Sequence, residues 1–296
     1  FYLSYKIFVF IILAVINIFT IKILRYLSLN FQTILILLAL INFNPYLVRF
    51  YLAIPTIIND LIFIAGILIV FEKIITNNKN KIFILIGYIF TFASRQTSIG
   101  LILAYLVTIF IKGKKLLSIK YTILGLLIFI LFLFLSIYYS SFTMESITSR
   151  SHLYSPKMRL FGFFIQDVAT KEKIIFLLLP LLSYAPLIFY LIFTRKFEIP
   201  IKKIINSKLL IFLFTFIILI IFLSILSGVE VTNRNVLRLT SLAYIPFLIF
   251  IIMITKERKN FIIGKKRFNL FVFIVALFHS FHPTFSIIKI FDILRF

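Results

Sequence analysis

Cysteine and tryptophan are absent from this 296-residue chain, and acidic residues are scarce, with only 9 Asp and Glu. Without cysteine, the chain can form no disulfide and no thiolate metal site. The three histidines do not cluster with carboxylates, so they predict no metal site either. The residue types that are abundant, Ile, Phe, Lys and Asn, match the amino-acid drift of an AT-rich genome and carry little functional weight.

Charge is the next property in short supply. Charged residues make up 14% of the chain and hydrophobic residues 62%, with a mean hydropathy of +1.14. A water-soluble core does not need this balance, whereas a protein that crosses the membrane several times requires it. We therefore expect an all-α, polytopic integral membrane protein that forms a single transmembrane domain over residues 1–296. About ten transmembrane helices are predicted, at residues 7–24, 31–43, 55–71, 82–94, 97–111, 121–139, 174–194, 209–227, 241–255 and 269–284.

The distribution of the cations gives the chain a direction in the membrane. A net charge of +23 would suggest nucleic acid in a soluble protein, but most cations here lie in short loops between predicted spans. Alternate loops hold 20 of the 32 Lys and Arg, which is the positive-inside pattern of cytoplasmic loops. No nucleic-acid partner is expected. The pattern predicts a multi-pass cell-membrane protein, in a bacterial inner membrane or, in a eukaryote, the endoplasmic reticulum.

The first predicted span enters the membrane from the outer face. The chain also begins at Phe1 without an initiator Met. Together these two features favour an N-terminal truncation over a cleaved signal peptide.

Three charged residues stand at the edges of apolar segments on the predicted outer face: Arg49, Asp60 and Arg95. An unpaired charge at such a position costs several kcal/mol unless it faces protein or water, which makes all three functional candidates. Asp60 follows Asn59 one turn inside its span, where its carboxylate can face a water-filled cavity. There it would bind a divalent cation, accept a hydroxyl proton or orient a sugar. The alternative is an ion pair with Arg49 or Arg95 that fixes helix packing.

Arginine dominates the cations in the outer segments. Guanidinium groups bind phosphate in a bidentate manner and stay charged at low dielectric, so these residues predict a site for an anionic headgroup. The alternative for each is snorkelling to ordinary lipid phosphates. Snorkelling is harder for Arg95, which lies between two apolar runs, and the site interpretation is favoured there. The six residues are Arg49, Arg95, Arg150, Arg159, Arg234 and Arg238.

Two short motifs suggest a family. Asn59 and Asp60 open one predicted span, and the sequence FASRQTS at 92–98 closes the next. With these motifs the chain resembles the GT-C class of polytopic glycosyltransferases, and within it the α-1,2-glucosyltransferase family that uses dolichyl-phosphate-glucose. NPYLVRF at 44–50 and NRNVLRLTSLAYIP at 233–246 are similar to further segments of that class. The family has Phe directly before Arg-Gln-Thr where this chain has Ser94, so the resemblance does not define the sugar.

The resemblance implies an enzyme that transfers a sugar from a polyprenyl-phosphate donor to a lipid-linked or cell-surface glycan on the extracytoplasmic face, among membrane lipids. It implies a principal catalytic base in a first outer loop upstream of Phe1, with Asp60 in support and Mg or Mn as the possible cation. Donor-phosphate ligands would be Arg95, Arg234 and Arg238. Other substrate-binding residues would be Arg49, Asn59, Gln96, Arg150 and Arg159. Two alternatives stay open: an O-antigen polymerase or ligase, and a non-enzymatic lipid-glycan flippase or transporter.

Overall fold

The protein is an all-helical bundle throughout the part of the chain that the structure describes. This computed structural model describes residues 2–42, 44, 58–77, 80–113, 119–143, 162–165, 167, 169–178, 184, 201–226, 236–255, 266, 270 and 274. No strand occurs in these ranges, which confirms the all-α class. Eight of the ten predicted spans coincide with helices there, and the other two, 174–194 and 269–284, are described only in part.

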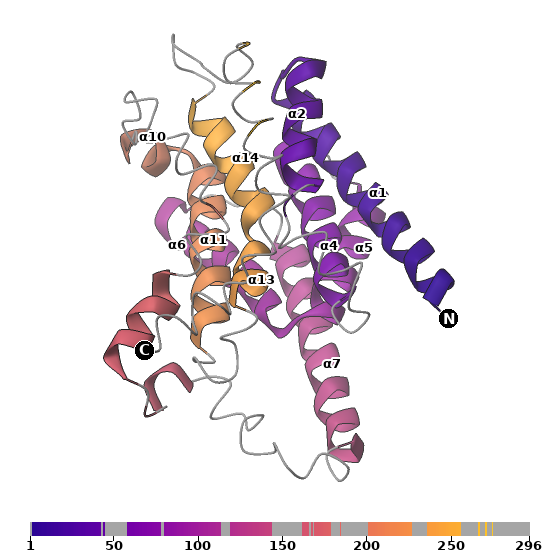
Figure 1. The fold of residues 1–296 in the computed structure, drawn as a ribbon, viewed down its shortest axis with the longest axis vertical. Coiled ribbons are helices and arrows are strands. Elements are labelled where there is room, and N and C mark those ends of the chain that lie inside the picture. Colours follow the sequence, from indigo (N-terminus) through magenta and orange to yellow (C-terminus); the bar gives the residue numbers. More distant parts are fainter. Residues whose placement is uncertain are drawn as a thin grey trace.

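Most helices run roughly along the long axis of the molecule (Figure 1). In chain order they are α1 (Tyr2–Tyr26), α2 (Phe31–Asn42), α4 (Ile58–Ile75), α5 (Lys81–Ser94), the 3-10 turn η3 (Gln96–Ser98), α6 (Ile99–Lys112), α7 (Ile119–Thr143), α10 (Ile201–Asn206), α11 (Lys208–Leu226), α13 (Val236–Ser241) and α14 (Tyr244–Thr255).

Helix α4 is the centre of the bundle. Its sequence is apolar on every side between Leu61 and Phe71, and it is buried over nearly its whole length by α1, α5 and aromatic rings of α11. Phe71 of α4, for example, packs edge-on against Phe212 and Phe216 of α11, with ring centroids 5.5 and 5.2 Å apart. A helix that is hydrophobic all round must be covered on all sides, and here the neighbouring helices cover it.

Two helices continue about one turn beyond their predicted C-terminal ends. Helix α4 continues to Ile75 and α7 to Thr143, whereas the predicted spans end at residues 71 and 139. In α4 the additional turn contains Glu72 and Lys73. Their side chains form an ion pair, and both residues are buried. Hydropathy ends a predicted span at the first charges, whereas in the structure both charged residues are buried within the helix.

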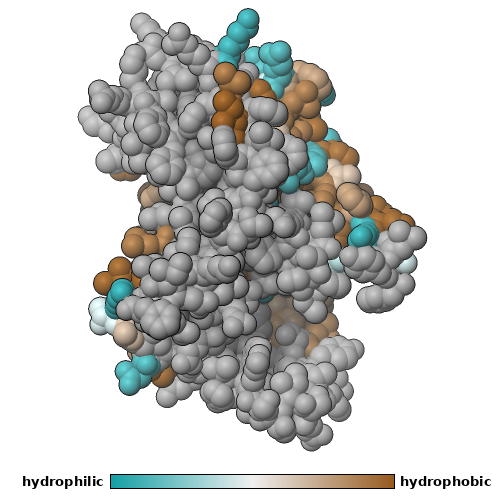
Figure 2. Space-filling view, viewed as in Figure 1, coloured by the Kyte–Doolittle hydropathy of each residue, from teal (hydrophilic) through white to brown (hydrophobic). Residues whose placement is uncertain are grey.

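Two of the helices are long and apolar enough to cross a membrane: Ser4–Tyr26 and Lys208–Leu226. The surface agrees with an apolar environment, because large hydrophobic side chains of α1 are about half exposed. Figure 2 shows hydrophobic side chains along the edge of the molecule that α1 forms. They include Ile7, Phe8, Phe10 and Ile11, exposed by 52, 48, 60 and 56%. A contiguous apolar surface of this kind marks contact with lipid or protein.

Candidate functional site

Asp60 and Arg95 form an ion pair at one end of the bundle. Asp60 lies in the first turn of α4, where the helix dipole favours a carboxylate. Arg95 is the C-cap of α5 and has an extended backbone. Its Nε donates a hydrogen bond to Asp60 Oδ1 at 2.5 Å, and its Nη2 contacts the same oxygen. The structure thus pairs Asp60 with one of the two arginines that the sequence offered as partners.

Tight packing of α4 against α5 brings the two residues together. The helices are antiparallel, so the start of α4 lies beside the end of α5. At their crossing, a Cβ added to Gly66 would lie 2.6 Å from Thr91 N and 2.8 Å from Gly87 O. Only glycine allows such a close backbone approach. The crossing therefore sets the separation at which Asp60 and Arg95 meet.

Burial of Asp60 corrects the expectation that its carboxylate faces a water-filled cavity. The residue is 0% exposed, whereas the side chain of Arg95 remains 26% exposed. The acid is thus enclosed by protein, and the arginine forms the accessible half of the pair. A buried carboxylate keeps its charge only when a cation and hydrogen bonds compensate for lost water, and Arg95 supplies both.

The guanidinium group of Arg95 has donors left for a ligand. Nε and Nη2 bond Asp60, and none of the described residues bonds Nη1. Because the side chain is partly exposed, an anion arriving from outside can accept from the free edge of the guanidinium while Asp60 holds the opposite edge. Asp60 therefore fixes the orientation of the Arg95 guanidinium group while leaving part of it exposed.

Two hydroxyl residues lie two and three positions after Arg95, and the sequence analysis did not select them. Thr97 ends in a buried Oγ1, and Ser98 is 0% exposed and precedes the first turn of α6. Neither hydroxyl has a hydrogen-bond partner among the described residues, and Ser98 makes no side-chain cap. Their place close after Arg95 in FASRQTS was the available signal, since polar groups at a helix start are typical anion ligands.

The other predicted site residues are placed to different degrees. Asn59 is exposed at the start of α4, and Gln96 belongs to η3. Arg238 belongs to α13, which packs on α11, the helix that η3 also contacts. Figure 1 shows α13 beside the lower part of α11. Arg49, Arg150, Arg159 and Arg234 lie outside the described residues.

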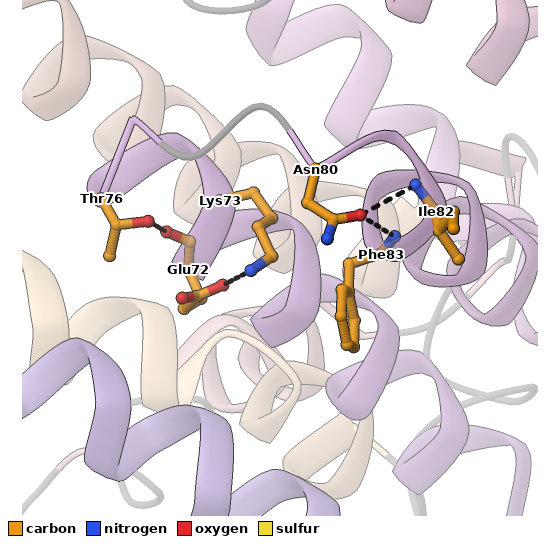
Figure 3. A network of polar contacts seen from close by, with 6 residues as sticks. All are labelled: Glu72, Lys73, Thr76, Asn80, Ile82 and Phe83. Atoms are coloured by element: carbon orange, nitrogen blue, oxygen red, sulfur yellow. Dashed lines mark hydrogen bonds and ion pairs between the residues drawn. The ribbon is translucent and has the colours of Figure 1, made fainter.

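At the opposite end of the α4–α5 hairpin the charges neutralise each other (Figure 3). Lys73 Nζ lies 2.8 Å from Glu72 Oε2 and 4.8 Å from the centroid of the Phe83 ring. Asn80 caps α5 by accepting hydrogen bonds from the backbone N–H groups of Ile82 and Phe83. The ion pair and the cap thus support the turn between α4 and α5, and the buried Glu72 and Lys73 balance each other's charge.

Among the described residues, no group of three or more His, Asp or Glu is placed to hold a metal ion. The chemistry that the described site can perform is thus recognition of an anion by the preoriented guanidinium group of Arg95. Neither a protein-family model nor a curated protein nor a solved structure matches the chain.

Proposed function

We propose that the chain is a membrane glycosyltransferase that takes a sugar from a polyprenyl-phosphate donor and transfers it to a hydroxyl group of a lipid-linked or cell-surface glycan. The observation that carries the proposal is the partly exposed Arg95, held by the fully buried Asp60 at a break between two apolar helices. A cation that is fixed at the ends of two apolar helices suits a phosphate that is attached to a lipid chain.

The proposal includes a multi-pass arrangement with about ten spans, and the extracytoplasmic face at the Asp60–Arg95 end. Basic residues at helix ends support this direction. Lys22, Arg25, Lys73, Lys81 and Lys112 all belong to helix ends assigned to the cytoplasm by the positive-inside rule. A polyprenyl donor anchored in the outer half of the membrane would present its phosphate at the depth of Arg95.

In the proposed reaction, the acceptor hydroxyl oxygen attacks the anomeric carbon of the sugar and the bond between that carbon and the phosphate oxygen breaks. The hydroxyl proton passes to a general base, and polyprenyl phosphate leaves with one additional negative charge. Arg95 stabilises this developing charge. Asp60 keeps the guanidinium oriented throughout. Arg234 and Arg238 are proposed as further phosphate ligands.

A transfer assay tests the proposal. Membranes that contain the full-length protein are incubated with radiolabelled polyprenyl-phosphate sugars and a lipid extract, and the label is followed from donor to glycan. We expect transfer in these membranes and at most about a hundredth of it in Arg95→Ala, since one oxyanion ligand is typically worth that factor or more. Transfer from a nucleotide sugar alone would exclude the donor class, and equal transfer in Arg95→Ala would exclude the site.

A further inference from the structure

The helix that carries Arg238 is separated from α14 by a break at Leu242 and Ala243. Pro246 explains the break, because proline has no N–H and its ring would collide with the carbonyl of Leu242 in a continuous helix. At such a break the direction of the short helix α13 depends on whatever contacts hold the two sides together.

One side chain from a distant part of the chain contacts both sides of the break. Tyr184 Oη donates a hydrogen bond of 2.5 Å to the carbonyl oxygen of Thr240 in α13. Its ring stacks on Tyr244 and meets Phe247 edge-on, with centroids 5.8 and 5.1 Å apart, and both rings belong to α14. Tyr184 is only 4% exposed, and Thr240 and Tyr244 are 0% exposed. A buried hydrogen bond to a backbone carbonyl and two ring contacts leave little freedom at this junction.

The position of α13 matters for the candidate site. Both α13 and η3 pack on α11, and η3 follows Arg95 directly. The start of α6 lies against the second half of α11, because a Cβ on Gly100 would meet Leu219 and Leu223 at 3.5 and 3.6 Å. The backbone of Arg238 therefore lies on the same supporting helix as the segment that follows Arg95.

We propose that Tyr184 is a positioning residue: its hydroxyl holds the α13–α14 break at the angle that sets Arg238 beside the phosphate bound by Arg95. The identity of the ligand rests on the proposed function. The restraint that Tyr184 places on the orientation of α13 does not. Tyr184 touches no substrate in this scheme and acts only through α13.

The restraint is tested first, in the full chain reconstituted in lipid nanodiscs, by hydrogen exchange of the α13 amides. Tyr184→Phe keeps the ring contacts and removes the hydroxyl, so exchange in Val236–Ser241 should become about tenfold faster. Tyr244→Phe is the matched control, because the Tyr244 hydroxyl is buried and bonds none of the described residues. Its α13 exchange should stay at the wild-type rate. Equal exchange in wild type and Tyr184→Phe would overturn the inference.

Binding of sugar-free polyprenyl phosphate then tests the link to Arg238. Tyr184→Phe should raise the Kd about three- to tenfold and raise the KM of the transfer reaction more than it lowers kcat, because a binding group is displaced. In an Arg238→Ala background the same substitution should have no further effect. A full effect in that background would overturn the positioning role. Absence of binding by the wild-type protein would instead refute the proposed function, and the exchange result would still decide the restraint on α13.

Discussion

At the scale of single residues, the Asp60–Arg95 pair combines a structural and a functional demand. Asp60 is 0% exposed and accepts from two nitrogens of Arg95. Removing the arginine alone leaves a buried charge without its compensation, which typically costs about 3–5 kcal/mol. Loss of activity in such a variant therefore has two possible causes, and the variants below separate them.

The first prediction concerns Arg95→Ala with and without Asp60→Asn. The single change should lower the midpoint of thermal unfolding in detergent strongly, and the double change should recover most of it because no buried charge remains. Transfer activity should stay lost in the double variant, since the phosphate ligand is still missing. Recovery of both stability and transfer would show that the pair is structural and that Arg95 binds no phosphate.

The second prediction concerns the shape of the cation. Arg95→Lys keeps the charge but loses the planar group that can bond Asp60 and a phosphate at once. Donor KM should rise about tenfold or more while the unfolding midpoint changes little, measured by transfer kinetics and thermal unfolding. Arg25→Lys is the control, because Arg25 is exposed at the far end of α1. An unchanged donor KM in Arg95→Lys would mean that phosphate binding needs only a positive charge at this position and not the planar guanidinium group.

At the scale of helices, the α4–α5 crossing decides whether the site exists. Gly66→Ala would place a methyl group 2.6 Å from Thr91 N, a backbone atom that cannot move alone. The third prediction is that this variant loses about 1–3 kcal/mol of stability, as overpacked cores do. It should also lose transfer, because the helices separate and Asp60 no longer reaches Arg95. Gly125→Ala is the matched control: its Cβ would lie 3.3 Å from ring atoms of Phe92 and Tyr88, which are side chains that can shift.

The result for Gly66→Ala is read from thermal unfolding and transfer assayed in parallel. If Gly66→Ala is as stable and active as Gly125→Ala, the close approach of the two backbones does not determine the site.

At the scale of the whole molecule, the proposed topology puts the Asp60–Arg95 end outside and the Lys73–Lys81 end inside. The chain contains no cysteine, so single cysteines can be introduced without altering the background. The fourth prediction is that an impermeant thiol reagent added to intact cells labels cysteines at Arg150 and Arg234, and labels those at Lys112 and Lys203 only after permeabilisation. Labelling at position 112 in intact cells would reverse the topology.

Composition and periodicity alone determined the helical class, the positions of most helices and the segment that carries Asp60 and Arg95. These properties are local, because hydropathy over a window of residues and the place of the first charge depend on neighbours in the chain. The break before α14 is also a local property, since Pro246 has no N–H and cannot lie in the interior of a helix without kinking or breaking it.

Only the tertiary structure decided which charges meet. The sequence left Asp60 free to face a cavity or to pair with Arg49 or Arg95, and the Gly66–Gly87 approach brings Arg95 to Asp60 across 35 residues. The burial of the Thr97 and Ser98 hydroxyls and the contact of Tyr184 with Thr240 were likewise decided by the tertiary structure. Such pairings depend on how closely two helices pack and on which faces they bury, and packing distances arise from side chains that are remote in the chain.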